Sequence, residues 1–245
     1  MSNGAFLYTS ATTGIIPTCT GSDSGYAIGS IYDGNPSTVH KYTAVSQTYV
    51  WDAGAGVTIS PLVISIHNHN LLATATVHVE FSANGSDWSD AMTSAALILG
   101  IDFYWFFTTL SAKRYWRVII TPAASYAITI GEICLWSNYH LLVRNYNWGY
   151  EEINVLYAQQ NNFWGQNVRS KISQGIGYNL SFDNVTAADK AILATIAKET
   201  AVVFIPDQAV NQCYHGMIQG DGLKSKVSYS GYSFQMTFLE NCKRV

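Results

Sequence analysis

The clearest pattern in the chain is strict alternation of apolar and polar residues, which is typical of β-strands that bury one face. In residues 76–81, Val77, Val79 and Phe81 alternate with polar side chains, so we expect a half-buried strand there. Further apolar, β-branched or aromatic runs lie at 62–67, 115–121 and 127–136. Turn clusters separate these runs. The first part of the chain is therefore predicted to be all-β, as a sandwich or a barrel.

Two of the turn clusters carry residues with a specific conformational use. The pair Asn84-Gly85 suits a two-residue type I′ hairpin turn, in which both residues have positive φ. Gly34, within Asp33-Gly34-Asn35, is likewise free to take a positive φ. We expect a tight turn at both places.

The second part of the chain contains one helical pattern. Thr186 begins a capping-box-like sequence, and an apolar stripe that includes Ile192 and Ile196 follows it, which predicts a helix at about 187–199. We expect strands on both sides of this helix, at 152–158, 201–205, 216–219 and 232–239. The second part is therefore predicted to be a strand-rich α+β domain with one packed helix.

Composition narrows the function classes. Only 12% of the residues are charged, whereas a typical soluble domain has about 25%. The high hydrophobic content (48%) excludes intrinsic disorder, and the net charge of −3 without a long basic run argues against nucleic-acid binding. Residues 1–136 hold four basic and eight acidic residues, and 137–245 hold nine and eight, so we place the domain boundary there.

The low charge has two explanations: a monomer with a neutral polar surface, or a surface covered by partner chains. Protein interfaces deplete charged residues and enrich aromatic ones, and aromatics make up 13% of this chain. Extended contact surfaces therefore account for the composition better than a free monomer does.

Targeting and redox signals are few. No stretch approaches the roughly 20 apolar residues of a membrane span, and the first residues lack the features of a signal peptide, so we expect no membrane insertion. The four cysteines show no C-x-x-C spacing, which argues against a zinc site or a disulfide framework. We expect reduced thiols and synthesis in a cytoplasm.

Arrangements that suggest catalysis are weak. Cys213 and His215 share a strand face, but a buried structural cysteine gives the same pattern. His67 and His69 have metal-chelating spacing, yet no third ligand can be named. Nucleophile-elbow and phosphate-binding motifs are absent from the sequence. We therefore expect a binding protein, not an enzyme, that requires no cofactor.

Five short motifs follow one another between residues 33 and 135. They are Asp33-Gly34-Asn35-x-x-Thr38, His69-Asn70-Leu71, Phe81-Ser82-x-Asn84-Gly85-x-x-Trp88, Arg114-Tyr115-Trp116-Arg117-Val118 and Ile130-Gly131-Glu132-Ile133-x-Leu135. In this order they resemble the discoidin, or coagulation-factor C-type, family of galactose-binding-like domains over about residues 5–136. The resemblance implies a jelly-roll β-sandwich for the predicted domain 1–136.

The same resemblance implies a structural calcium ion between the Asp33 turn and the end of the domain. Asp33, Thr38 and Glu132 would supply the hard oxygen ligands that calcium prefers. The alternative is that Asp33 caps its own turn and Glu132 accepts hydrogen bonds from backbone N–H groups.

Carbohydrate binding through loops at one end of the sandwich is also implied. The candidate residues for this site are His40, Tyr42, His69, Asn70 and Trp105. The family commonly has Trp where this chain has His40, a departure that affects the pocket beside the loop. Alternatives stay open here: His69 and Asn70 suit a satisfied strand-end turn, and the aromatic run 103–107 suits core packing or a subunit contact.

Motifs of the second part, residues 137–245, resemble the C-terminal β-domain of tail-tip or baseplate proteins (distal tail type) of long-tailed bacteriophages. These motifs are Val203-Phe204-Ile205-Pro206-Asp207, Cys213-Tyr214-His215-Gly216 and Gly231-Tyr232-Ser233-Phe234. The resemblance implies a homo-oligomeric ring, a trimer or hexamer, that contacts other tail-tube or baseplate proteins.

Together the two resemblances predict a structural virion protein of a phage tail, made in the host cytoplasm, whose jelly roll binds a cell-surface glycan. The alternative is a free carbohydrate-binding module that targets a polysaccharide-active partner. Avidity in a ring would strengthen weak sugar sites.

Overall fold

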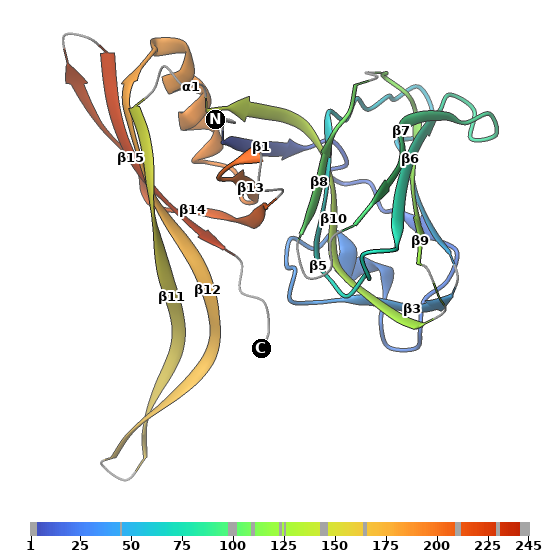
Figure 1. Ribbon diagram of the computed structural model, residues 1–245, viewed down its shortest axis with the longest axis horizontal. Coiled ribbons are helices and arrows are strands. Elements are labelled where there is room, and N and C mark those ends of the chain that lie inside the picture. The colour runs from blue at the N-terminus through green and yellow to red at the C-terminus, as the bar shows by residue number, and fades with distance from the viewer. Residues whose placement is uncertain are drawn as a thin grey trace.

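The protein is mainly β, as its sequence predicts (Figure 1). The computed structural model describes residues 4–44, 46–97, 102–108, 111–122, 124, 126–142, 147–163, 166–208, 212–228 and 231–240. Within these residues the strands form a ten-stranded sheet and a five-stranded sheet, called here the large sheet and the small sheet. No helix among the described residues is long and apolar enough to cross a membrane.

The first half of the chain contributes all of the small sheet and part of the large one. The strands of the small sheet, in spatial order, are β2 (Thr18–Cys19), β4 (Gln47–Asp52), β9 (Tyr115–Thr121), β6 (Thr76–Ser82) and β7 (Ser89–Ala96). The large sheet takes β1 (Ala5–Ser10), β3 (His40–Ala44), β5 (Val63–His69), β8 (Phe103–Phe106) and β10 (Tyr126–Leu141). A short 3-10 helix, η1 (Ile28–Ile31), precedes β3.

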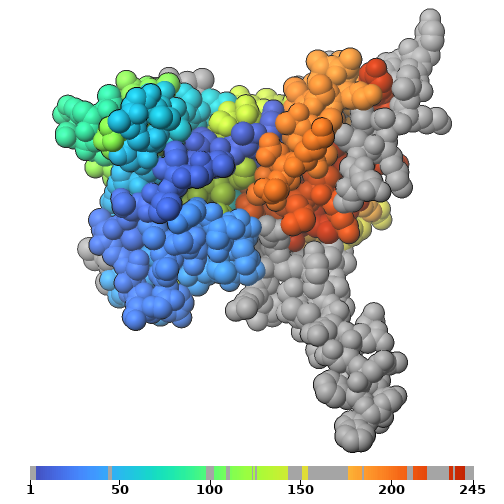
Figure 2. All heavy atoms as spheres, turned by 180° about the vertical axis from the view of Figure 1, so that it is seen from behind, coloured from blue at the N-terminus to red at the C-terminus, as the bar shows by residue number. Residues whose placement is uncertain are grey.

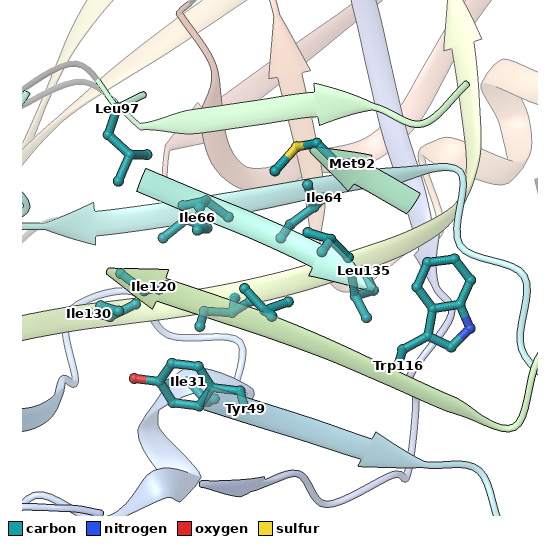
Figure 3. Close-up of a cluster of buried hydrophobic side chains, with 14 of the residues drawn as sticks. Ile31, Tyr49, Ile64, Ile66, Met92, Leu97, Trp116, Ile120, Ile130 and Leu135 are labelled. Carbon is teal, nitrogen blue, oxygen red and sulfur yellow. The ribbon is translucent and has the colours of Figure 1, made fainter. Parts of the chain in front are cut away.

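These two sets of strands face each other and enclose an apolar core, as a jelly-roll β-sandwich does (Figure 3). Tyr49 and Trp116 enter the core from the small sheet, and Ile64, Ile66 and Ile130 enter it from the large sheet. All five side chains are fully buried. The alternating apolar positions of the predicted strands are therefore the positions that meet between the sheets.

The second half adds five strands to the large sheet and contributes one helix. The strands are β11 (Asn147–Phe163), β12 (Gln166–Val185), β13 (Val202–Ile205), β14 (Tyr214–Ser228) and β15 (Gly231–Glu240). The helix α1 (Ala187–Ile196) confirms the predicted helix, although it ends before residue 199. Thr186 caps it as expected, because its Oγ1 accepts a hydrogen bond of 3.2 Å from Asp189 N.

Helix α1 packs on the large sheet through the predicted apolar stripe. Leu193 and Ile196 are fully buried in a cluster with Phe6, Phe204 and Phe238, which come from β1, β13 and β15. This cluster is the core of the second half of the chain.

Strand β1 joins the two halves. It pairs antiparallel with β10 on one side and with β13 on the other, so the large sheet runs without a break from the jelly roll into the second half. In Figure 2 the jelly roll, blue to green, lies directly beside the orange and red second half. The proposed domain boundary between residues 136 and 137 falls inside β10, so separate folding of the two parts stays a prediction.

An irregular point in the large sheet holds the Asp33 turn against β10. Asn68 has a φ of +49°, and its Nδ2 donates a 2.6 Å hydrogen bond to Pro36 O. A Cβ on Gly131 would lie 2.3 Å from the same Pro36 oxygen, so only glycine fits there. This close approach brings the turn next to Glu132.

The turn predictions had different outcomes. Gly34 has a φ of +75°, as expected. The type I′ turn is wrong, because Gly85 alone of the pair has a positive φ and the connection between β6 and β7 spans residues 83–88. Asn84 instead caps the loop through its side chain, whose Oδ1 accepts hydrogen bonds of 2.9 Å from both Ser86 N and Asp87 N.

We expect Gly131→Ala to lower the free energy of unfolding by about 1–3 kcal/mol, because the added methyl group forces Pro36 away from β10. Gly21→Ala is the matched control, since a Cβ there meets nothing within 4 Å, and its effect should stay within about 0.5 kcal/mol. Urea unfolding of both variants measures this. Equal stability of the two would contradict the proposed contact.

Candidate functional site

The structure places two of the predicted sugar-binding residues inside the protein. His40 and Tyr42 are 0% and 2% exposed. His40 lies between Ser22 Oγ, 2.8 Å from its Nε2, and the Tyr49 hydroxyl, 3.0 Å from its Nδ1. Burial lowers the pKa of His40 and raises that of Tyr42, so both side chains stay neutral as parts of the interior.

Two further predicted residues hold the end of β5. Asn70 Nδ2 donates to Ala127 O at 2.9 Å, and Asn70 Oδ1 accepts from Thr129 N at 2.8 Å. His69 Nδ1 accepts a 3.3 Å hydrogen bond from Leu71 N. These contacts are the strand-end turn that the sequence left open as an alternative.

Trp105 is 43% exposed, but it lies in β8 at an edge of the large sheet and not in a loop. Its neighbour Phe103 packs against the sandwich core, and the Tyr104 hydroxyl donates to Gln208 O at 3.2 Å. With His40 and Tyr42 buried, the five predicted residues do not form one exposed surface.

The predicted calcium ligands do lie together. Asp33 caps its own turn, since Oδ1 accepts from Asn35 N at 2.8 Å and Oδ2 accepts from Thr38 Oγ1 at 2.6 Å. Glu132 Oε1 lies 3.4 Å from Gly34 N in the same turn. The open alternative of turn capping is therefore also present in the structure.

Glu132 provides the test of whether a cation fits. Its side chain is 3% exposed, and among the described residues its Oε2 has no hydrogen-bond partner. Burial, together with the charge of Asp33, raises the pKa of Glu132 from 4.5 to about 8. A buried carboxylate oxygen beside a second carboxylate fits a hard cation such as calcium, which would compensate both charges. Calcium binding itself stays a prediction.

A second buried polar group lies where the two halves meet. His67 Nδ1 is 3.0 Å from Asp102 Oδ2, and its Nε2 is 2.8 Å from Ser65 Oγ. This order of serine, histidine and aspartate matches that of hydrolase triads. Ser65 and His67 are fully buried, however, and Ser65 Oγ also accepts a 2.8 Å hydrogen bond from Trp136 Nε1. This hydrogen-bonded network is therefore part of the interior where the two halves meet.

Cys213 and His215 belong to the same interior. Both are buried, and the His215 ring lies 5.0 Å from the His67 ring. Burial and the neighbouring His67 lower the pKa of His215 to about 3, so its imidazole stays neutral. Cys19 is half-buried, Cys134 and Cys213 are buried, and Cys242 lies outside the described residues.

The outer face of the small sheet carries a cluster that the sequence analysis did not identify. We call it the sheet-face cluster, and its members are His78, Glu80, Trp88, Asp90 and Arg117. The strand register places Glu80 opposite Arg117 of β9 on one side and opposite Asp90 of β7 on the other. Only the alternation of His78 and Glu80 with buried apolar residues marked this face in the sequence.

Contacts within the sheet-face cluster fix its side chains. Arg117 Nε donates to Glu80 Oε2 at 2.5 Å, and the Arg117 guanidinium lies 4.1 Å from the centre of the Trp88 ring. His78 Nε2 lies 2.9 Å from Asp90 Oδ1. The side chains of His78, Arg117 and Asp90 are 28%, 27% and 51% exposed, so a ligand in solution reaches them.

Comparisons with known proteins give matches in solved structures. No known protein family matches the chain, and a search of curated proteins also finds no match. A pectin-binding carbohydrate-binding module is 16% identical over 53% of this chain and 93% of its own, with a TM-score of 0.41. A carbohydrate-binding module of a family 31 glycoside hydrolase from Clostridium perfringens is 14% identical over 53% of this chain and 99% of its own (TM-score 0.43). A chitosan-binding module from Paenibacillus sp. IK-5 is 15% identical over the same shares, with a TM-score of 0.43.

The raised pKa of Glu132 predicts how stability depends on pH. The folded protein holds a proton on this carboxyl up to about pH 8, whereas the unfolded chain loses it near 4.5. In the presence of a chelator, the free energy of unfolding should therefore fall by up to about 5 kcal/mol between these pH values. Glu132→Gln should remove this decline, and urea unfolding at a series of pH values measures it.

Glu151→Gln, at an exposed position of β11, is the control and should keep the decline. Calcium added at pH 8 should restabilise the unsubstituted protein and not Glu132→Gln. The same pH dependence in the unsubstituted protein, Glu132→Gln and Glu151→Gln would contradict the raised pKa of Glu132.

Proposed function

We propose that the jelly roll binds carbohydrate and that the sheet-face cluster is its contact surface. The observation that carries this proposal is the Trp88 ring, which lies against the Arg117 guanidinium on a solvent-accessible sheet face, where Glu80 in turn holds Arg117. The proposal keeps the predicted function of the jelly roll. It moves the contact surface from the residues first predicted to the outer face of the small sheet, beside the end of the β6–β7 connection that carries Trp88.

The chemistry of a sugar ring fits this arrangement. A pyranose presents an apolar C–H face and a rim of hydroxyl groups, so it binds where an aromatic ring lies beside planar hydrogen-bonding groups. Trp88 supplies the ring and an indole N–H. Arg117 and Asp90 supply donors and acceptors, and Arg117 is already held in place by Glu80, which reduces the entropy lost on binding.

Calcium has a supporting role in this proposal. Bound between Asp33 and Glu132, it would hold the turn at residues 33–38 against β10 and so stabilise the sandwich that displays the cluster. We propose it as a structural ion, separate from the sugar contact.

Trp88→Ala should weaken glycan binding at least about tenfold, because the stacking surface is lost. Trp105→Ala is the matched control: it removes an exposed tryptophan elsewhere on the jelly roll and should change the affinity by less than about twofold. An array of plant, animal and bacterial cell-wall glycans identifies the best-bound glycan, and calorimetry with that glycan gives the affinities.

Near-ultraviolet circular dichroism confirms that both variants are folded. Loss of binding in Trp105→Ala with binding retained in Trp88→Ala would move the contact to the edge of the large sheet. A complete absence of binding on the array would contradict carbohydrate recognition itself.

We also propose that the second half of the chain serves in assembly, because β11 and β12 extend far beyond the other strands (Figure 1). They pair with each other as far as Phe163 and Gln166, whereas β12 pairs with β15 only between Gly177 and Val185. Among the described residues, the outer part of the hairpin thus has no third strand. It measures roughly 30 Å, at about 3.3 Å per residue for some ten residues.

Such a two-stranded arm is marginally stable alone in water, which favours a partner that completes it. Its sequence supports contact with another chain, since residues 153–182 contain two charged residues, Arg169 and Lys171, and no carboxylate. A ring of identical subunits, trimeric or hexameric, in a phage tail tip is the specific setting that the sequence resemblance predicts. A free carbohydrate-binding module remains the alternative setting for the same jelly roll.

Replacing residues 156–174 by Asn-Gly tests the arm, because Val155 and Gly175 face each other and a two-residue turn joins them. Light scattering should show the unsubstituted protein as an oligomer and the shortened one as a monomer that still binds glycan. A full-length protein that stays monomeric at high concentration would contradict the assembly role and favour the free module.

A further inference from the structure

The sheet-face cluster contains a group of side chains with metal-binding chemistry. His78, Glu80 and Asp90 each offer a ligand atom, and these atoms all lie within 4.8 Å of one another. Among the described residues this is the one group of three such side chains at that spacing. It lies apart from the Asp33 turn and shares no residue with it.

The strands position all three side chains on one face. His78 and Glu80 are two residues apart on β6, so they point to the same side of the small sheet. Asp90 faces Glu80 from the neighbouring strand β7. Ligands fixed on paired strands need little reorganisation to bind an ion.

Contacts around the group orient its carboxylates. Arg117 Nε donates to Glu80 Oε2, which leaves Oε1 for a ligand. Glu80 is 8% exposed, so its carboxylate is held in one place. Hydrogen-bonded outer partners of this kind are typical of metal-ligating carboxylates. Arg117 also offsets one of the two negative charges, which leaves a net charge of −1 for a cation to meet.

The ligand set favours a transition metal over calcium. One imidazole nitrogen and two carboxylate oxygens match the donors of zinc sites with three protein ligands and an open position. A tetrahedral zinc ion with bonds of about 2.0 Å needs ligand atoms about 3.3 Å apart, a spacing that small side-chain rotations produce from the present one. The existing contact of 2.9 Å between His78 Nε2 and Asp90 Oδ1 is the one that the ion would replace.

We propose that His78, Glu80 and Asp90 bind a zinc ion on the outer face of the small sheet. This site goes beyond the proposed glycan binding and does not depend on it.

Calorimetric titration of the chelator-treated full chain with zinc chloride tests the site in the absence of any glycan. The unsubstituted protein should bind about one equivalent, and His78→Gln and Asp90→Asn should each weaken binding at least about tenfold. Asp87→Asn is the matched control, since Asp87 lies in the connection before β7 and outside the group, and it should bind zinc as the unsubstituted protein does.

Cobalt substitution separates this site from the cysteine side chains, because thiolate ligands give an intense charge-transfer absorption that nitrogen and oxygen ligands lack. We expect cobalt binding without that band, and unchanged binding in Cys19→Ser. Near-ultraviolet circular dichroism confirms that each variant is folded. The proposal is overturned if the protein does not bind zinc, if His78→Gln binds as tightly as the unsubstituted protein, or if the cobalt complex shows the thiolate band.

Discussion

The position of β1 between β10 and β13 is the constraint on which the rest of the structure depends. Its backbone completes the hydrogen bonding of both neighbours, and Ala5, Phe6 and Leu7 are fully buried. Phe6 enters the core beneath α1, while Ala5 and Leu7 pack on the opposite face with Val203 and Trp136. One short strand thus joins two hydrophobic cores, and the jelly roll and the second half share a single sheet.

This arrangement decides which sheet faces are accessible to solvent. The outer face of the large sheet carries the buried Ser65, His67 and Cys134 near the junction, so that face is used for packing. The outer face of the small sheet carries His78, Asp90 and Arg117 in partial contact with solvent. A ligand of the jelly roll therefore has access to the small sheet, and the extended β11–β12 hairpin leaves the second half available for contact with another chain.

Most strands and the helix could be predicted from the sequence because their signals are local: alternation in residues 76–81, and the Thr186 cap before an apolar stripe. The sheet-face cluster could not be predicted, because it depends on how the strands are aligned with one another in the sheet. Glu80 meets Arg117 and Asp90 only once β6, β7 and β9 are paired. The burial of His40 could not be predicted either, because its ring nitrogens contact Ser22 and Tyr49, which lie at other places in the sequence. The length of β11 and β12 could not be predicted, because their polar sequence shows little alternation of apolar and polar residues.

The most direct test of carbohydrate recognition by the sheet face is nuclear magnetic resonance of the indole N–H groups of the seven tryptophans during titration with the best-bound glycan. The account predicts that the Trp88 signal shifts in a saturable way while those of the buried Trp51 and Trp136 stay in place. A saturable shift of Trp105 without any change at Trp88 would contradict it.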